Sequence, residues 1–192
     1  GGGVKYRTIV ADPPWQMTAG PKWTGKKGQG AHGTGPSRPL PYPTMTVDAI
    51  AMLPVPDMAE DAAHLYLWTM NAHLESAYRV AREWGFRPAQ MLTWCKTPRG
   101  LGLGGAFTST TEFILFCRRG TLPTQRRMET TWWNWKRPEA GTGPMHSRKP
   151  EAFLDMVERV SPGPYLEMFA RRNRLGWDTW GNECLEHVEV VQ

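Results

Sequence analysis

The sequence predicts an α/β fold, in which strands and helices alternate and the strands form one parallel or mostly parallel sheet. Runs rich in apolar, β-branched and aromatic residues predict strands at residues 5–10, 62–68, 91–95, 112–117, 165–169 and 177–180. Apolar residues at helical spacing predict helices at residues 46–53, 73–84 and 150–160. This alternation is typical of parallel sheets with right-handed crossovers. The 192 residues suffice for one domain with a substantial core, which we place at residues 4–192.

The helix boundaries follow from residues that commonly cap or stop helices. Thr46 is a suitable N-cap for the first helix, and Pro54 ends it. Asn71 is expected to cap the second helix, and Gly85 to stop it. Pro150 suits the first position of the third helix, because a helix start leaves that N–H unbonded in any case.

Composition limits the partners and cofactors of the protein. A net charge of +5 favours an anionic partner, although a protein that is merely basic fits the same number. No apolar run is long enough to span a membrane. Cys95, Cys117 and Cys184 are odd in number and far apart, which favours free thiols in a reducing cytoplasm over disulfides. The cysteines and histidines show no metal-ligand spacing, so we expect no metal site.

Three segments rich in glycine, proline or cations are predicted to be inserted target-binding loops, at about residues 16–46, 97–111 and 120–148. Residues 20–27 nearly match a phosphate-binding loop, but Lys27 stands where the magnesium-binding Ser or Thr belongs. Residues 28–33 match a dinucleotide fingerprint, but they neither follow a strand nor open a helix. We reject both matches and interpret residues 16–46 as a lid, with a disordered surface loop as the alternative.

The third of these loops combines cations with tryptophans. Its candidate nucleic-acid contacts are Arg126, Arg127, Trp132 and Trp133, with Trp135, Lys136 and Arg137 close by in the sequence. Cations bind phosphates and flat aromatic faces stack on bases, so the pattern favours a nucleic-acid surface. The alternative is a loop that its tryptophans pin to the body of the domain.

The segment Ala11-Asp12-Pro13-Pro14-Trp15 follows directly on the first predicted strand. An acid at the carboxyl end of a strand lies where open α/β sheets bind ligands. The two prolines fix the backbone and supply carbonyl oxygens without N–H donors. Asp12 and the Pro13 carbonyl would thus form a rigid row of acceptors for an exocyclic amine, and Trp15 would stack on the ring that carries it. The alternative is a strand-ending turn whose tryptophan merely packs.

A second acid, Glu167, interrupts the apolar strand at residues 165–169. In a parallel sheet the ends of this strand and of the Asp12 strand could meet at one edge. A buried acid needs a hydrogen-bonding partner. The diol of a ribose would serve, and a salt bridge to Arg171 or Arg174 is the alternative.

Taken together, these residues resemble the MT-A70 family, S-adenosylmethionine-dependent methyltransferases that act on the 6-amino group of adenine in RNA or DNA. The resemblance runs in order from about residue 5 to residue 183. Besides the Asp-Pro-Pro-Trp block, it rests on blocks at residues 41–45, 65–68, 94–97, 147–150, 161–163, 167–171 and 181–183.

The resemblance implies a Rossmann-like methyltransferase fold in which the catalytic block precedes the cofactor block. It implies a catalytic role for Asp12, Pro13, Pro14 and Trp15. It implies a target-base pocket completed by Tyr42, with Lys96 and Glu112 near its rim. It implies a site for S-adenosylmethionine formed by Lys149, Glu167, Phe169, Arg171, Asn173, Asn182 and Glu183. Ala170, Asn173 and Glu183 depart from residues found in other members, which are Gly, His and Gln, respectively.

We therefore expect direct methyl transfer to adenine, without a covalent enzyme intermediate. The target base must leave a duplex stack or already be unpaired. The chain resembles the small bacterial and phage members, which favours DNA, and RNA is the alternative. A catalytically inactive nucleic-acid-binding scaffold is a second alternative, and an amine methyltransferase for small molecules or protein glutamine is a third. Family members often pair, so a homodimer is also expected.

Overall fold

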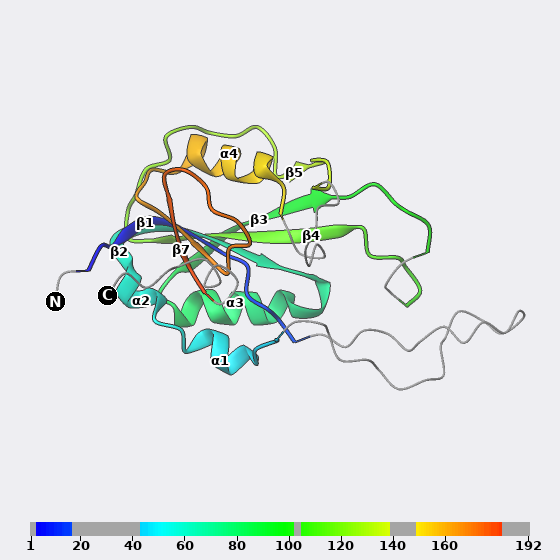
Figure 1. Ribbon diagram of the computed structural model, residues 1–192, viewed down its shortest axis with the longest axis horizontal. Coiled ribbons are helices and arrows are strands. Elements are labelled where there is room, and N and C mark those ends of the chain that lie inside the picture. Colours follow the sequence, from blue (N-terminus) through cyan, green and yellow to red (C-terminus); the bar gives the residue numbers. More distant parts are fainter. Residues whose placement is uncertain (1–2, 17–42, 102–104, 139–148, 182–192) are drawn as a thin grey trace, which may run out of the picture.

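The computed structural model describes residues 3–16, 43–101, 105–138 and 149–181. Within them, the chain forms a seven-stranded sheet in the order β5-β3-β4-β2-β1-β6-β7 (Figure 1). The strands are β1 (Tyr6–Ala11), β2 (Ala59–Thr69), β3 (Arg87–Cys95), β4 (Thr111–Arg119), β5 (Trp132–Trp133), β6 (Tyr165–Met168) and β7 (Trp177–Trp180). The six predicted strands are confirmed. The two-residue β5, in the third predicted loop, is an addition.

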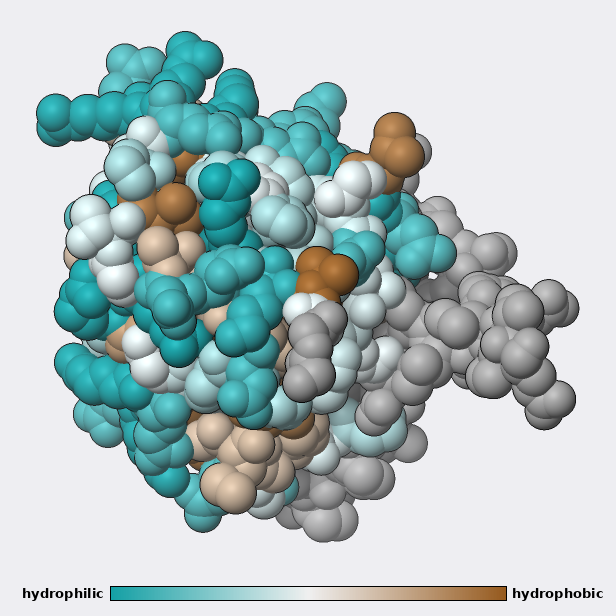
Figure 2. All heavy atoms as spheres, turned by 90° about the vertical axis from the view of Figure 1, so that its left-hand side faces the viewer, coloured by the Kyte–Doolittle hydropathy of each residue, from teal (hydrophilic) through white to brown (hydrophobic). Residues whose placement is uncertain are grey.

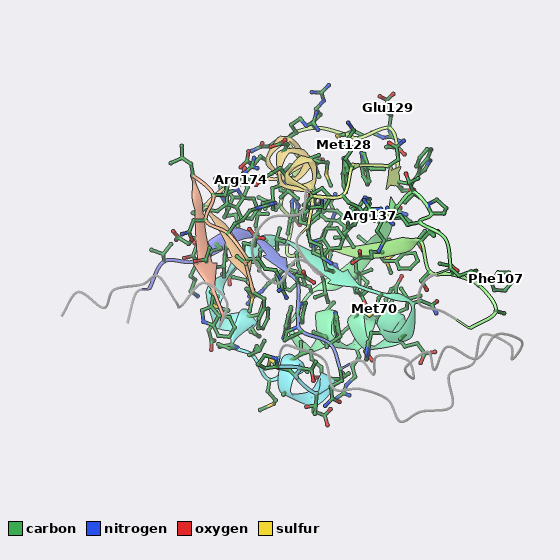
Figure 3. All side chains as sticks on the ribbon, turned by 45° about the vertical axis from the view of Figure 1, so that its right-hand side comes forward. Met70, Phe107, Met128, Glu129, Arg137 and Arg174 are labelled. Atoms are coloured by element: carbon green, nitrogen blue, oxygen red, sulfur yellow. The ribbon has the colours of Figure 1, made fainter. Side chains whose placement is uncertain are left out.

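One strand of the sheet, β4, runs against all the others. β1 is parallel to β2 and β6, β6 is parallel to β7, and β3 is parallel to β5. β4 is antiparallel to both of its neighbours, β2 and β3. The reversal arises because no helix separates β3 from β4, so the chain turns back as a hairpin. Phe107, labelled in Figure 3, lies in this connection and is 87% exposed. The predicted mostly parallel sheet is confirmed, with this one exception.

The helices differ from the predictions mainly at their starts. They are α1 (Val47–Ala51), α2 (Val55–Met58), the 3₁₀ helix η1 (Asn71–His73), α3 (Leu74–Glu83) and α4 (Glu151–Val160). Thr46 caps α1 as predicted, since its hydroxyl accepts from the Ala49 N–H at 3.1 Å. The prediction that Asn71 caps a helix is wrong, because it lies inside η1 and neither η1 nor α3 has a side-chain cap. Gly85 follows α3 at φ +85°, as the predicted stop requires. Pro150 is the N-cap of α4, one position before the predicted one.

The two faces of the sheet bury different helices. Ile9, Leu65 and Leu115 belong to the core cluster shared with α1, α2 and α3. Val10, Tyr66 and Ile114, the neighbours of those residues along the strands, belong to the cluster beneath α4. Figure 1 shows α4 on one side of the sheet and α1 and α3 on the other. Side chains alternate along each strand, so this division fixes which functional residues face α4.

The ends of β1, β2 and β6 meet at one edge of the sheet. Ala11 is paired with Leu67 of β2 and with Met168 of β6, and the Asp12 N–H donates to the Met168 carbonyl at 3.3 Å. The sequence-based expectation that the Asp12 and Glu167 strands meet is therefore confirmed. We call this edge the carboxyl edge.

The chain leaves β6 through a tight turn. Phe169 has φ +61°, a value that few residues other than glycine adopt, and its N–H donates to the Trp180 carbonyl at 2.6 Å. Gly181 has φ +119°, a conformation that side chains rarely allow, and a Cβ there would make a tight contact of 3.1 Å with the Phe169 nitrogen. The strained residue at this exit is thus Phe169, and Ala170 follows it as a buried residue.

The surface and the cysteines give little information about the function of the protein. Hydrophilic residues cover most of the face shown in Figure 2, and the hydrophobic ones stand in small separate groups. Cys95 and Cys117 are free thiols, and Cys184 lies outside the described residues. Among the helices of the described segments, none combines the length and apolarity needed to cross a bilayer. The described residues also hold no group of three or more His, Cys, Asp or Glu placed to share a metal ion.

Candidate active site

The Asp-Pro-Pro-Trp segment forms a turn that is held on both sides. The Trp15 N–H donates to the Pro13 carbonyl at 2.8 Å, and the Met45 N–H donates to the Pro14 carbonyl at 2.8 Å. Residues 15 and 45 also form an isolated parallel bridge. The Pro13 carbonyl therefore already accepts one hydrogen bond, and one lone pair remains for the predicted contact with an amine. Asp12 itself is 19% exposed at its side chain, so the carboxylate is reachable.

The structure changes the role expected for Trp15. Its indole is only 2% exposed, and the indole N–H donates to the Trp68 carbonyl at 2.9 Å. His73 stacks on it with ring centroids 5.3 Å apart, and a nitrogen of the His73 ring lies 2.6 Å from the Gln16 carbonyl oxygen. Trp15 therefore packs the turn against β2 and η1, and its indole does not present an open face to a base. The packing of Trp15 agrees with the alternative interpretation of the turn, and the sequence pattern gave no sign of which ring would cover the indole.

Four side chains at the carboxyl edge form a charge cluster, defined as Asp12, Lys96, Glu112 and Lys149. The Lys149 Nζ lies 2.6 Å from Glu112 Oε1 and 3.7 Å from Asp12 Oδ2. The Lys96 Nζ lies 2.9 Å from Glu112 Oε2. The four side chains are between 13% and 21% exposed, and Lys149 also lies 4.8 Å above the Trp68 ring centroid. The predicted rim residues Lys96 and Glu112 are therefore joined to the catalytic acid through Lys149.

Burial and pairing together set the protonation of the charge cluster. Burial raises the pKa of Asp12, with Glu112 adding to the shift and Lys149 opposing it. Burial also disfavours the charge on Glu112, but Lys149 and Lys96 outweigh it and lower the pKa of Glu112. Burial opposes the charge on Lys149 as well, but Asp12 and Glu112 outweigh it and raise the pKa of Lys149. Glu112 and Lys149 are thus a firm ion pair, while the charge of Asp12 is held least firmly.

Glu167 carries a buried oxygen that lacks a partner. Residue 167 pairs with Val10 on the α4 face, next to the end of β1. Its Oε2 atom is buried and has no hydrogen-bond partner among the described residues. Burial raises the pKa of Glu167 to about 7. The alternative of a salt bridge to Arg174 is wrong, because that guanidinium is occupied by acids of α4.

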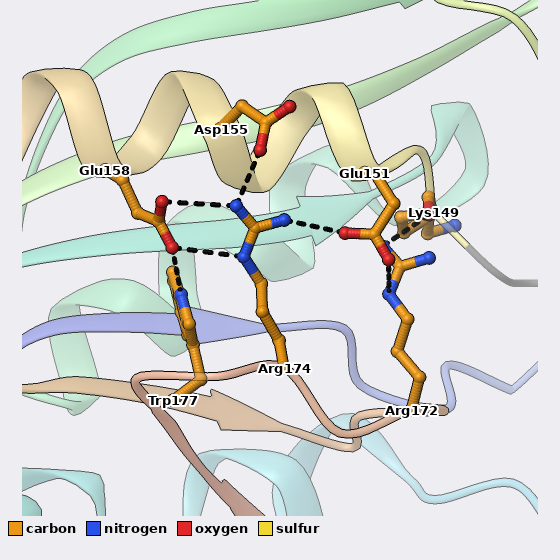
Figure 4. Close-up of polar contacts among 7 residues, drawn as sticks. All are labelled: Lys149, Glu151, Asp155, Glu158, Arg172, Arg174 and Trp177. Carbon is orange, nitrogen blue, oxygen red and sulfur yellow. Dashed lines mark hydrogen bonds and ion pairs between the residues drawn. The ribbon is translucent and has the colours of Figure 1, made fainter.

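A second ionic network, which we call the α4 clamp, ties the segment after β6 to α4 (Figure 4). Arg174 contacts Glu151 at 2.7 Å, Asp155 at 2.6 Å and Glu158 at 3.0 Å. Arg172 contacts Glu151 at 2.9 Å and donates to the Lys149 carbonyl at 3.0 Å. The α4 clamp therefore holds the backbone of Lys149 beside the carboxyl edge.

The remaining predicted cofactor residues lie at different depths. Phe169 is 8% exposed and packs edge-on against Trp180, with ring centroids 5.7 Å apart. Arg171 is half-buried and Asn173 is exposed in the segment between β6 and β7. Three predicted site residues lie outside the described residues, namely Tyr42, Asn182 and Glu183.

The predicted nucleic-acid residues divide into two kinds. Trp133 stacks on Trp135 at 5.1 Å, and the Trp135 carbonyl accepts from the Trp94 indole N–H at 2.9 Å. These two tryptophans pin the loop, as the alternative interpretation held. Arg126 and Arg127 are exposed, and Trp132 is 57% exposed on the edge strand β5. These three residues remain candidates for a binding surface.

The fold and the carboxyl edge together define a class of protein. The sheet has one reversed strand. The Asp-Pro-Pro-Trp turn, with its hydrogen-bond acceptors, follows β1, and the buried acid Glu167 lies on the adjacent strand β6. This is the Rossmann-like fold of methyltransferases that use S-adenosylmethionine. The MT-A70 family model matches residues 6–183, and the chain belongs to this family.

The similar proteins include a Type II methyltransferase and N(6)-adenosine-methyltransferases. The chain is 30% identical to the Type II methyltransferase M.MunI of Mycoplasma sp, over 97% of this chain and 81% of that protein. It is 27% identical to a putative N(6)-adenosine-methyltransferase MT-A70-like protein of Medicago truncatula, covering 97% of this chain and 28% of the relative. It is 23% identical to the human N(6)-adenosine-methyltransferase catalytic subunit METTL3, covering 93% and 28%, respectively. The chain thus spans most of M.MunI but little more than a quarter of the other two.

Proposed function

We propose that this protein transfers a methyl group from S-adenosylmethionine to the 6-amino group of adenine in DNA. The observation that carries the proposal is the position of the Asp12 carboxylate and its loose contact with Lys149. A rigid turn holds its carboxylate at the carboxyl edge, and its ionic contact with Lys149 is a loose one of 3.7 Å. Its lone pairs are therefore available to accept hydrogen bonds from an amine.

The residues around Asp12 suit the chemistry of a neutral amine. The Asp12 carboxylate would accept one amine N–H, and the free lone pair of the Pro13 carbonyl would accept the other. Holding both hydrogens turns the nitrogen lone pair away from the acceptors, and positioning of this kind supplies much of the rate. Bound S-adenosylmethionine would supply the methyl group as an electrophile on its sulfonium sulfur: an N–CH3 bond would form as the S–CH3 bond breaks, giving S-adenosylhomocysteine, and the amine would lose one proton. Trp15 and His73 keep the turn rigid from behind.

The residues present fit the cofactor. The unsatisfied Oε2 of Glu167 is a ready acceptor for the hydroxyls of a ribose. Lys149 would meet the carboxylate of the methionine portion, and the ribose and adenine would lie along Phe169, Arg171 and Asn173. The predicted contacts of Tyr42, Asn182 and Glu183 complete the list of residues to be tested.

DNA is favoured over RNA by the extent of the resemblance. The chain is 30% identical to the Type II methyltransferase M.MunI, against 23% to the METTL3 catalytic subunit. RNA adenine methylation is the second candidate, because these N(6)-adenosine-methyltransferases share the same matched region. An inactive scaffold is disfavoured by the intact Asp-Pro-Pro-Trp turn and its charge cluster. A homodimer and a cytoplasmic location stay predictions, and light scattering tests the first.

Methyl incorporation into four substrates tests the proposal. The purified chain is incubated with tritiated S-adenosylmethionine and duplex DNA, single-stranded DNA, RNA or a protein lysate. Mass spectrometry of the digested nucleosides then identifies the product. We expect N6-methyladenine in DNA. Label in RNA alone would favour the second candidate, and label in protein alone would contradict adenine methylation.

Replacement of Asp12 tests the assigned acceptor. Asp12→Ala removes the carboxylate but leaves the backbone of the turn, so we expect methylation to fall by about 10³-fold or more with cofactor affinity retained. Asp57→Asn, at an exposed position of α2, is the matched control and is expected to keep full activity. Near-normal turnover of the Asp12→Ala variant would refute this role for Asp12.

A further inference from the structure

A groove of about 930 Å³ opens on the α4 face of the sheet and is lined by residues of β2, β3, β4, β5 and α4. Its size is within the range of about 300–1,000 Å³ that ligand sites usually have. None of the four residues of the charge cluster lines it, so it is separate from the candidate active site. We call it the α4 groove. Its floor includes Leu92, Phe116 and Met156, and its rim includes Arg126, Arg127 and Trp132.

The floor of the α4 groove is apolar. Leu92 comes from β3, Phe116 from β4 and Met156 from α4. Met128 and Glu129, which also line the groove, lie beside α4 and β5 in Figure 3. An apolar floor offers nothing to a phosphate, but it suits the flat face of a base or another apolar group. The floor therefore points to a ligand with both apolar and charged parts.

The rim of the α4 groove is cationic and not neutralised. Arg126 and Arg127 are exposed, and neither forms an ion pair with any residue in the described segments. Glu129 is the one acid among the groove residues, against three arginines including Arg118. Arg174, by contrast, is surrounded by three acids of α4. The rim is thus suited to the phosphates of a nucleic acid.

Trp132 adds an exposed aromatic side chain to the same border. It is 57% exposed, whereas its neighbour Trp133 is stacked on Trp135. No packing need in the described structure explains why residue 132 is a tryptophan. In proteins that bind single strands, such exposed rings stack on bases.

One strand of the sheet connects the two sites. β3 contributes Lys96 to the charge cluster just after its end, and Leu92 and Gln90 to the α4 groove. At a rise of about 3.3 Å per residue, the groove lies roughly 13–20 Å from Lys96. A polynucleotide whose target base enters at Asp12 can therefore reach the α4 groove with a nearby portion of the same strand.

We infer that the α4 groove binds the unpaired strand beside the target adenine. Arg126 and Arg127 contact its phosphates, and its bases lie over the apolar floor and against Trp132. A duplex would bring only its phosphates to the groove, because its bases are stacked inside, so the apolar floor selects an unpaired strand. The inference rests on the proposed function for its target base, but the binding itself is testable without catalysis.

Fluorescence anisotropy with labelled single-stranded oligonucleotides tests this inference on the full chain. Strands of about 4 and about 16 nucleotides, each with one central adenine, separate contacts at the active site from contacts in the groove. The double variant Arg126→Ala, Arg127→Ala should bind the long strand about tenfold more weakly and the short strand as before. Its slope of log affinity against log salt should fall by about 1.4, the value for two phosphate contacts on a single strand.

Matched variants separate charge, stacking and folding. Lys5→Ala with Arg82→Ala removes two exposed cations elsewhere, Arg82 from α3 on the opposite face, and should leave long-strand affinity within about twofold of wild type. Trp132→Ala should weaken long-strand binding about tenfold, and Trp132→Phe should restore most of it. Arg126→Lys with Arg127→Lys should restore the salt slope. Thermal melts confirm that each variant is folded.

Three outcomes would overturn the inference. These are equal long-strand affinity in the double arginine variant, an equal loss for short and long strands, and displacement of the long strand by an acidic peptide at equal concentration. Loss of methylation has a different meaning. If wild type binds long strands through the groove but methylates none, the proposed function fails and the groove assignment stands.

Discussion

Two ionic networks on the α4 face use the same kinds of side chain for different ends. In the α4 clamp, Arg174 makes contacts of 2.6–3.0 Å with three acids whose side chains are 35–57% exposed. In the charge cluster, the acids are 19% exposed and the contacts range from 2.6 Å to 3.7 Å. The clamp is tight and faces water, whereas the cluster is buried and holds one member, Asp12, loosely.

This contrast indicates which network is the candidate for chemistry. Exposed ion pairs contribute little each, so the α4 clamp serves to hold one helix and the backbone of Lys149 in place. A buried cluster costs desolvation and is weak evidence for stability. Such a cluster with one loosely held acid at a sheet edge is a candidate functional site. Variants in the two networks should therefore separate stability from function.

The largest effect is expected from Lys149→Met. It leaves Asp12 and Glu112 as two buried acids without their shared cation, which should lower the free energy of unfolding by about 3 kcal/mol. It should also abolish binding of S-adenosylhomocysteine measured by calorimetry. Denaturant unfolding measures the first effect.

A double variant separates the two contributions of Lys149. Lys149→Met with Asp12→Asn removes the acid that has lost its cation, while Glu112 keeps its contact with Lys96, so most of the stability should return while cofactor binding stays lost. If calorimetry shows an unchanged dissociation constant in either variant, Lys149 does not meet the cofactor.

An effect of similar or smaller size, with the opposite sign, is expected from Glu167→Gln. The pKa of Glu167 is about 7 in the folded protein against 4.5 for the free side chain, so folding favours its protonated form. Wild-type stability should therefore fall as pH rises from about 4.5 to about 7, by at most about 3 kcal/mol. Glu167→Gln should be the more stable protein at pH 8 and lose that advantage near pH 4.

Glu167→Gln should also weaken binding of the cofactor, so the same variant is expected to gain stability and lose affinity. A carboxylate accepts both hydroxyls of a ribose, whereas the amide oxygen and nitrogen of Gln accept and donate. We expect about tenfold weaker binding of S-adenosylhomocysteine. Glu60→Gln, exposed at the start of β2, controls for the loss of one negative charge. A stability gain without a loss of affinity would leave Glu167 outside the cofactor site.

The smallest effect is expected from Arg174→Met. It breaks the contacts with Glu151, Asp155 and Glu158, and should cost about 1–2 kcal/mol because Arg174 is only 18% exposed. Arg79→Met is the control, because Arg79 is 50% exposed and its loss should lower the free energy of unfolding less than the loss of Arg174. Methylation per folded molecule should be unchanged. A large loss of activity at a temperature where the variant is folded would show that the α4 clamp takes part in the reaction.

Most of the fold could be predicted from the sequence, and the exceptions have local causes. Strands and helices have periodic apolar patterns, and Thr46 and Gly85 act within one turn of chain. The two-residue β5 was missed because it has no period, and Asn71 because a 3₁₀ turn and an N-cap favour the same residue types. The reversal of β4 depends on the hairpin connection, for which no helical segment was predicted.

The sequence predicted which residues form the candidate site, but not how they contact one another. Asp12, Lys96, Glu112 and Lys149 were each singled out, yet their joining into one cluster was not, because Lys149 and Glu112 lie 37 positions apart. Trp15 was expected to be open, and its cover, His73, was not singled out. Patterns in a sequence show which side chains are chemically able, but contact between distant segments decides which of them are occupied.

By itself, the sequence determined the acceptor turn after the first strand, the acid on β6 and the alternation that puts both at one edge. These depend on neighbours in the chain, since proline geometry and side-chain alternation are local properties. Only the tertiary structure decided that Trp15 packs behind the turn and that Arg174 forms ion pairs with acids of α4. It also decided that Glu167 has a buried oxygen without a hydrogen-bond partner among the described residues. The reason is physical: burial and charge pairing arise between elements far apart in sequence, and they alone set which groups stay available for a ligand.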